Sequence, residues 1–269
     1  MSASRDSALS TTDITVEFED YTPVRGISVR IDEGKTVAVM GRSGSGKSTF
    51  IKAAAGIIPA SSGSVSIFGK TLGPLNNRDL LRLRKTCGFV FQDAALWQNM
   101  SVYRNLELPL EQHYPQLSRS ERERKIRRAI EQIRFTDDLN LRPASLSAGE
   151  AKLVAFVRAI LTEPRLLILD EPTTFVDRTG VDRVLNLLRN LKEAGTTLVV
   201  VSHNATVVSQ LADEIVVIEE GKLLVHGEPE DVASSDDPRV RDIVSDVLNQ
   251  AATFDTDILS LLGEIDDEL

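Results

Sequence analysis

The stretch Gly41–Thr49, which reads GRSGSGKST, constrains the possible folds of this chain more than any other. It matches the pattern G-x-x-x-x-G-K-[ST], in which glycines let the backbone curl so that successive N–H groups point inward at phosphate oxygens. The apolar run Thr36–Met40 precedes it, and FIKAAAG, a plausible helix, follows. This strand–loop–helix context predicts a phosphate-binding loop.

Two side chains of this loop suit a nucleoside triphosphate. Lys47 can reach the β- and γ-phosphates, and Ser48 can place its hydroxyl on Mg²⁺. A flexible Gly/Ser turn is the alternative, and it would not need the flanking strand and helix.

Hydrophobic patterning predicts an α/β fold. Short continuous apolar runs, typical of strands buried on both faces of a parallel sheet, lie at 36–40, 166–170 and 197–201. Alternating apolar and polar residues, typical of half-buried strands, lie at 14–18, 27–31 and 64–68. Helical patterns lie at 119–135 and 181–193. We therefore expect an α/β core, an antiparallel strand layer near the N-terminus and a helical insertion over about 93–162.

Composition excludes several classes of protein. The single cysteine, Cys87, rules out an internal disulfide, and no apolar run is long enough to span a bilayer. The first residues lack the apolar segment of a signal peptide, so we expect a cytoplasmic location. The net charge is −9, and residues 228–269 carry 13 acidic and 2 basic side chains. An acidic chain without a basic aromatic stripe argues against nucleic acid as a partner.

The apolar run LLILD ends in a second candidate group for the same site. Asp170 would lie at the carboxyl end of the sheet, where it can hold Mg²⁺ through water. Glu171 is placed to polarise a water molecule aimed at the γ-phosphate. Two carboxylates could also mark an ordinary strand exit, but together with the loop about 120 residues earlier they indicate phosphoryl chemistry.

Two further stretches admit more than one interpretation. SLSAGEA, Ser145–Ala151, fits a helix capping box formed by Ser147 and Glu150, or a phosphate grip at a helix N-terminus. His203 follows the run TLVVVS, where it could cap the strand or contact a γ-phosphate. His113 and His226 receive no role.

Together these stretches resemble the nucleotide-binding subunit of ABC transporters over about residues 14–245. In chain order, the resemblance rests on Phe18 (adenine-stacking aromatic), Gly41–Thr49 (Walker A), Gln92 in FVFQDAALW (Q-loop), LSAGE at 146–150 (signature motif), Leu166–Asp170 (Walker B), Glu171 (catalytic glutamate), Asp177 in TTFVD (D-loop) and His203 in VVSHN (H-loop). A phosphate loop alone would be unspecific, whereas this ordered set is highly specific.

The resemblance implies a P-loop NTPase (RecA-like) core with an N-terminal antiparallel β subdomain and an α-helical signature subdomain. The ATPase domain would span 12–249, with the helical subdomain at about 93–162 and an acidic extension at 250–269. ATP and Mg²⁺ would be the cofactors. Implied catalytic residues are Lys47, Glu171 and His203, and implied metal-binding residues are Ser48, Gln92 and Asp170. Implied nucleotide-binding residues are Phe18, Gly41, Arg42, Ser43, Gly44, Ser45, Gly46, Lys47, Ser48, Thr49, Gln92, Ser147, Gly149, Glu150 and Asp177.

ATPases of this family work as head-to-tail dimers, so Ser147 and Gly149 would contact the ATP held by the other subunit, most simply in a homodimer. The chain departs from the family pattern at three places. Ala148 replaces a glycine and would be strained by about 1 kcal/mol if φ must be positive. Glu150 replaces a glutamine and puts negative charge near a triphosphate, which suggests slow turnover. Thr174–Val176 replaces the usual Ser-Ala-Leu.

Two stretches also resemble the ATPases of Mla- or Mce-type lipid transport systems: DAALWQNMSVYRNLELPL after Gln92, and Asp237-Pro238-Arg239-Val240-Arg241. This implies phospholipid transport on the cytoplasmic face of the inner membrane, with a permease and an Mce-type substrate-binding protein. The alternatives are the ATPase of another ABC importer, or a non-transport regulator of a membrane partner. The stretch 93–110 would receive the permease, with Trp97, Met100 and Tyr103 as apolar anchors or as ordinary core.

Overall fold

The computed structural model describes residues 6–73, 77–202 and 204–245. Its strands are β1 (Ser7–Phe18), β2 (Tyr21–Asp32), β3 (Thr36–Met40), β4 (Ser62–Ile67), β5 (Lys70–Thr71), β6 (Cys87–Val90), β7 (Leu166–Asp170), β8 (Thr197–Val201), β9 (Glu214–Glu219) and β10 (Lys222–Gly227). Its α-helices are α1 (Lys47–Ala54), α2 (Asn77–Thr86), α3 (Val102–His113), α4 (Arg119–Gln132), α5 (Ala148–Ile160), α6 (Arg178–Glu193), α7 (Ala205–Leu211) and α8 (Pro229–Ala233). A 3₁₀ turn spans Pro143–Ser145, and residues 238–245 are also helical.

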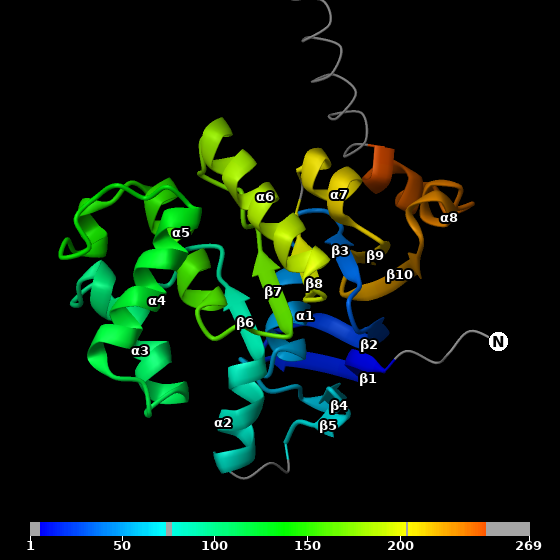
Figure 1. Ribbon diagram of the computed structural model, residues 1–269. Helices are drawn as coiled ribbons and strands as arrows, with labels where there is room; N and C mark the ends of the chain where they lie inside the picture. Colours follow the sequence, from blue (N-terminus) through cyan, green and yellow to red (C-terminus); the bar gives the residue numbers. More distant parts are fainter. Residues whose placement is uncertain (1–5, 74–76, 203, 246–269) are drawn as a thin grey trace, which may run out of the picture.

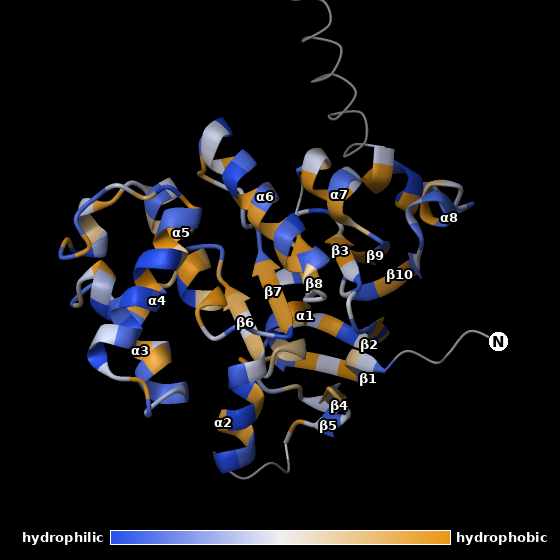
Figure 2. Ribbon diagram, viewed as in Figure 1, coloured by the Kyte–Doolittle hydropathy of each residue, from blue (hydrophilic) through white to orange (hydrophobic). Residues whose placement is uncertain are grey.

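A six-stranded sheet of order β10-β9-β3-β8-β7-β6 forms the centre of the molecule (Figure 1). Strands β9, β3, β8, β7 and β6 run parallel, and β10 pairs antiparallel with β9 at one edge. Every residue of β3, β7 and β8 is buried, so the three apolar runs are confirmed as central strands (Figure 2).

Alternate residues of these strands face two different layers, which explains why the runs are apolar without interruption. Leu167 and Val200 pack in the cluster formed by α3 to α6, whereas Ile168 and Val199 pack in the cluster formed with α1 and the N-terminal strands. Figure 1 shows α5 and α6 on one side of the sheet and β1, β2 and α1 on the other. Both faces are therefore covered, and the carboxyl ends of the strands share one edge.

The N-terminal strands form a separate antiparallel sheet of order β2-β1-β4-β5. The alternating stretches at 14–18, 27–31 and 64–68 are confirmed as strands, although β1 and β2 extend to 12 residues each. Phe18 pairs with Tyr21 at the turn that joins β1 to β2. This turn lies on the same side of the molecule as the phosphate loop, since the Tyr21 hydroxyl donates to the Gly44 carbonyl at 3.4 Å.

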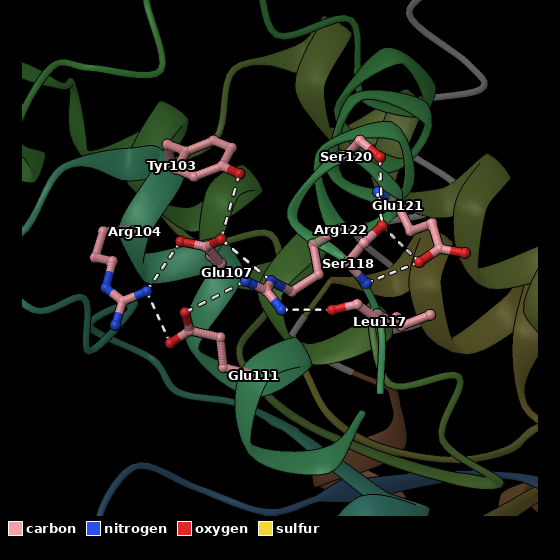
Figure 3. A network of polar contacts seen from close by, with 9 residues as sticks. All are labelled: Tyr103, Arg104, Glu107, Glu111, Leu117, Ser118, Ser120, Glu121 and Arg122. Atoms are coloured by element: carbon pink, nitrogen blue, oxygen red, sulfur yellow. Dashed lines mark hydrogen bonds and ion pairs between the residues drawn. The ribbon is translucent and has the colours of Figure 1, made fainter. Parts of the chain in front are cut away.

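Helices α3, α4 and α5 lie between Gln92 and β7. The helical pattern at 119–135 corresponds to α4. A capping box formed by Ser118 and Glu121 lies at the N-terminus of this helix. A network of charged side chains ties α3 to α4, because Glu107 accepts from Arg104 at 2.9 Å and from Arg122 at 3.2 Å (Figure 3). No helix of the described residues is long and apolar enough to cross a membrane.

Candidate functional site

The phosphate loop joins β3 to α1 and depends on glycine at two close approaches. Gly46 has a φ of 100°, and a Cβ on it would lie 2.0 Å from the Pro23 carbonyl oxygen. Gly41 has a φ of 150°, and a Cβ on it would lie 2.0 Å from the Ile218 carbonyl oxygen. The loop therefore fits between β2 and β9 only if both side chains are absent.

The Lys47 side chain stabilises the conformation of this loop through hydrogen bonds to its backbone. Its Nζ donates to the Gly41 carbonyl at 2.7 Å and to the Arg42 carbonyl at 2.8 Å. Burial lowers the pKa of Lys47, while the nearby carboxylates of Glu171, Glu219 and Asp170 oppose this shift. The ammonium group is thus close to the carboxylates at the strand ends, where it can neutralise phosphate oxygens.

Ser48 and Asp170 form the metal-binding part of the site. The Ser48 hydroxyl donates to Asp170 Oδ1 at 2.8 Å, although 122 residues separate them. Asp170 is fully buried, and its Oδ2 has no hydrogen-bond partner within the described chain, while the Lys52 Nζ lies 3.8 Å away. A buried carboxylate oxygen without a hydrogen bond beside a hydroxyl fits Mg²⁺, which keeps several waters and takes few protein ligands.

The structure describes no cluster of three or more His, Cys, Asp or Glu side chains that could hold a metal without phosphate. The Ser48 hydroxyl and the Asp170 carboxylate supply two protein oxygens, which fits a metal ion whose other ligands are phosphate and water. This is the usual arrangement for Mg²⁺ in phosphoryl-transfer sites.

Glu171 follows Asp170 at the carboxyl edge of the sheet. Its φ is 49°, a left-handed conformation that is uncommon outside glycine, and its backbone N–H donates to the Val201 carbonyl at 2.9 Å. The Thr174 hydroxyl donates to Glu171 Oε2 at 3.4 Å. This turn directs the backbone out of β7 next to the end of β8. His203 lies outside the described residues, so its role stays a prediction.

Lys152 is a residue of this region that sequence reasoning missed. It is buried on α5, and its Nζ donates to the Phe91 carbonyl at 3.0 Å and to the Gln92 carbonyl. Asp170, Asp93 and Glu171 are close enough to raise its pKa against the dominant effect of burial, which lowers it. The helix that starts at the signature motif thus holds the backbone at Gln92. The sequence signal that could have identified Lys152 is its charge within the otherwise apolar pattern of α5.

The stretch SLSAGEA begins α5 with a capping box. Ser147 is the N-cap and accepts from the Glu150 N–H at 3.2 Å, and the Glu150 carboxylate accepts from the Ser147 N–H at 2.7 Å. The hydrogen bonds from Ser147 lower the pKa of Glu150. Ala148 lies in the first turn of α5 and is not among the residues with positive φ, so the strain considered for it is absent.

Gly149, within the capping box of α5, packs closely against the backbone of the D-loop. A Cβ on Gly149 would lie 3.0 Å from the Phe175 carbonyl oxygen, a tight contact. Phe175 is itself 72% exposed and has a φ of 67°. Asp177 caps α6 by accepting from the Gly180 N–H at 2.7 Å. These residues form one surface, and no hydrogen bond or ion pair joins them to Gly41–Thr49 in the described part of the chain.

Phe18 lies at the same end of the molecule as the phosphate loop, at the turn between β1 and β2. Its strand partner Tyr21 reaches the loop through the hydrogen bond to Gly44. Both rings are about half exposed, so each has a free face for a planar ligand. Sequence reasoning selected Phe18 and missed Tyr21, because only the pairing across the turn brings Tyr21 to the loop.

Arg42 is held by two carboxylates that the sequence did not suggest. Its N–H donates to Glu219 Oε2 at 3.3 Å, and its guanidinium lies 3.7 Å from Glu219 Oε1 and 3.6 Å from Asp242 Oδ2. Glu219 ends β9 and Asp242 lies in the helix at 238–245. The last described helix therefore contacts the phosphate loop.

Comparisons with known proteins agree with this geometry. The family described as ABC transporter matches residues 24–174. The methionine import ATP-binding proteins MetN of Clostridium acetobutylicum and Rhizobium meliloti are 31% and 33% identical, over 80% and 79% of this chain. The chain spans only 67% and 59% of the lengths of these two relatives.

Solved structures show the same fold. A dimeric post-hydrolysis state of the ATP-binding cassette MJ0796, bound to ADP and Pi, matches with a TM-score of 0.76 and 27% identity, over 82% of this chain and 98% of that chain. CbiO1 from Clostridium perfringens, part of the cbiONQ complex, matches with a TM-score of 0.71 and 28% identity, over 86% and 92%. The chain therefore belongs to the ABC transporter family and has the fold of an ATP-binding cassette.

Proposed function

We propose that this chain is the ATP-hydrolysing subunit of an ABC importer and that it drives a membrane permease as a dimer. The observation that carries the proposal is the Ser48–Asp170 pair, which joins the phosphate loop to the carboxyl end of β7 at 2.8 Å. This pair brings a hydroxyl, a buried carboxylate and the Lys47 ammonium to one edge of the sheet. Phosphoryl transfer depends on such positioning and charge stabilisation.

Each residue of this edge has a distinct task in hydrolysis. The N–H groups of Gly41–Thr49 and the Lys47 ammonium hold the β- and γ-phosphates. Ser48 and Asp170 would hold Mg²⁺, which would neutralise charge on the phosphate oxygens. Glu171 orients the attacking water, and His203 contacts the γ-phosphate. Gln92 senses the metal and nucleotide, while Lys152 fixes its backbone.

The second half of the site comes from another copy of the chain. Ser147, Gly149 and Glu150 lie at the start of α5, a positive helix end that suits an anion. The capping box uses the Ser147 and Glu150 N–H groups, so the Gly149 N–H is the one that contacts phosphate in this proposal. The related cassette whose title describes a dimer is the support for a second subunit. Phe18 stacks on the adenine, and Asp177 lies at the contact between the two subunits. The capping box does not compete with this role, because only part of the first turn is used.

Import of a small solute is the transport function that fits the relatives best. The curated relatives reported above carry the name methionine import, which makes methionine the first cargo to test. The prediction of phospholipid transport with an Mce-type partner has no support from them. The structure also gives a local reason for Asp237–Arg241: Asp237 accepts from the Arg239 N–H at 2.9 Å and Pro238 opens a helix, as in a common helix start.

The permease contact is proposed at the stretch 93–110. Trp97 is 59% exposed, whereas Met100 and Tyr103 are partly buried, so Trp97 is the one anchor that reaches solvent freely. The Arg158 guanidinium holds the backbone before Trp97 through the Ala94 and Ala95 carbonyls, at 3.0 and 2.7 Å. The chain would then lie on the cytoplasmic face of the membrane through its permease.

The test measures hydrolysis and dimerisation of the purified full chain. ATP hydrolysis that requires Mg²⁺ is expected, with a large loss for Glu171→Gln and no loss for Glu131→Gln, a matched exposed control. Excess ATP should trap Glu171→Gln as a dimer on size exclusion. A wild-type rate in Glu171→Gln would overturn the site. Co-purification with a permease, followed by uptake of labelled methionine into vesicles, tests the importer; bound phospholipid without uptake would favour the lipid alternative.

A further inference from the structure

A groove of about 820 Å³ lies at the amino ends of β7 and β8, at the edge of the sheet opposite the phosphate loop. Helix α4 forms one wall, and the ends of α5 and α6 with the loops before β7 and β8 form the other. Neither the nucleotide site nor the proposed permease contact uses any residue of this groove.

The rim of this groove is positively charged. Four basic side chains line it against two acidic ones: Arg124, Lys125, Arg128 and Arg165, with Glu121 and Glu163. Lys125 pairs with Glu163, and Arg165 pairs with Glu33 at 2.6 Å.

Two of the four basic side chains form no ion pair with an acidic residue that the structure describes, although Arg124 is close enough to Glu121 to help lower its pKa. Arg124 and Arg128 lie one turn apart on α4, both exposed, and form no ion pair with any residue that the structure describes. The Glu121 carboxylate accepts from the Ser118 N–H at 2.7 Å, so its capping role occupies it (Figure 3). The groove therefore presents two adjacent positive charges to a ligand.

The floor of the groove is apolar. It is lined by Leu117, Ala129, Ile160, Leu161, Pro164 and Leu191. A ligand that fits both parts must carry apolar groups for the floor and negative charges for the rim. A short amphipathic acidic peptide has this chemistry, because its aliphatic side chains gain by burial and its carboxylates by pairing with arginine.

The chain itself contains such a segment outside the described residues. Residues 246–269 hold seven acidic and no basic side chains. Within them, DILSLLGEIDDE, residues 257–268, contains five aliphatic and five acidic residues, with most of the acidic ones at its end. We propose that this acidic segment of the chain docks into the groove, with its aliphatic residues on the floor and its carboxylates at Arg124 and Arg128.

The length of the segment allows this contact. The described chain ends at Ser245, just after Val240, Ile243 and Val244 pack with residues of α7 and β9. An extended chain spans about 3.3 to 3.6 Å per residue, so Asp257 can lie about 40 Å from Ser245 and Asp266 about 70 Å away. A domain of this size has a radius of gyration of about 18 Å, so the groove of the same copy or of a second copy is within reach.

Disulfide trapping in the full chain tests the proposal. In a Cys87→Ser background, Gln132→Cys on the groove is combined with Leu262→Cys in the segment. Arg127→Cys replaces Gln132→Cys as the control, because Arg127 lies on α4 outside the groove and pairs with Glu123. We expect a bond with the groove cysteine and about tenfold less with the control cysteine. A monomeric product places the segment in its own groove, a dimeric product in that of a second copy, and both support the contact.

Charge reversal identifies the recognition chemistry. Arg124→Glu with Arg128→Glu should lower the trapped fraction about five- to tenfold and weaken its dependence on salt, since paired surface charges are screened by ions. Arg127→Glu is the matched control and should leave the fraction unchanged. Equal trapping at both cysteines, or a fraction that ignores the reversal, would overturn the proposal. Far-UV circular dichroism of each variant shows that the fold is intact.

Discussion

Asn105 is the buried side chain that positions the proposed permease contact. It is 0% exposed on α3, and its amide closes the turn before the helix. The side-chain Oδ1 accepts from the Trp97 N–H at 2.8 Å, while the Nδ2 donates to the Trp97 carbonyl at 3.1 Å and to the Ser101 carbonyl at 3.0 Å. Asn105→Ala therefore removes three hydrogen bonds. The Trp97 N–H loses its acceptor, whereas the Trp97 carbonyl still accepts from the Met100 N–H at 3.1 Å and the Ser101 carbonyl from the Asn105 N–H at 3.0 Å.

The expected cost follows from this count. A hydrogen bond contributes about 0.5 to 1.5 kcal/mol net, so three give a loss of about 1.5 to 4.5 kcal/mol in the free energy of unfolding. A domain of this size has about 5 to 15 kcal/mol in total, so Asn105→Ala should still fold. Urea unfolding followed by far-UV circular dichroism measures the loss as a lower midpoint at unchanged slope.

Trp97 reports the local effect, because it is the only tryptophan of the chain. Its backbone is released in Asn105→Ala, so acrylamide should quench its fluorescence more strongly than in the wild type. Asn140→Ala is the control, because the Asn140 side chain is exposed and its hydrogen bond among the described residues is to Asp138. A loss of less than about 0.5 kcal/mol is expected. A loss below about 1 kcal/mol in Asn105→Ala together with unchanged quenching would refute the reasoning.

Three further predictions concern single residues. Gly46→Ala should abolish ATP binding, measured by calorimetry, because its Cβ would meet the Pro23 carbonyl at 2.0 Å; Gly73→Ala, whose Cβ would meet nothing within 4 Å, is the control for positive φ. Glu150→Gln should keep the melting temperature, because glutamine also completes a capping box with Ser147. The same substitution should raise the rate of ATP hydrolysis, because it removes negative charge near the partner's nucleotide. An unchanged rate would show that this charge does not slow turnover. Burial raises the pKa of the Cys87 thiol to about 11, so its alkylation at pH 8 should be about a hundredfold slower in the folded chain than in urea. The free energy of unfolding should also fall as the pH rises above about 9 toward 11, because the unfolded chain loses this proton first. Equal alkylation rates in the folded chain and in urea would contradict the burial of the thiol.

Local chemistry made much of the fold predictable from the sequence. The three central strands follow from uninterrupted apolar runs, because both faces of the sheet are covered and no alternation is needed. The phosphate loop follows from its glycines, and the start of α5 from Ser147 and Glu150, because these features depend on neighbours within a few residues. The type of these elements was therefore predictable from short-range effects.

The relations between distant residues were decided by the tertiary structure alone. Ser48 meets Asp170 because the parallel order of the sheet brings the ends of β3 and β7 to one edge. Lys152 reaches the Gln92 carbonyl only because α5 packs beside β6. The position of Lys152 in an apolar helix does not reveal, from the sequence, that its side chain lies near Gln92.

The same limit applies to charge. Basic residues of α4 are visible in the sequence, but which of them remain unpaired depends on neighbours such as Glu163 and Glu33, which lie far apart along the chain. A sequence pattern records the chemistry available at each position and its nearest neighbours along the chain. The contacts that turn this chemistry into a site are made through space, and they exist only once strand order and helix packing are set.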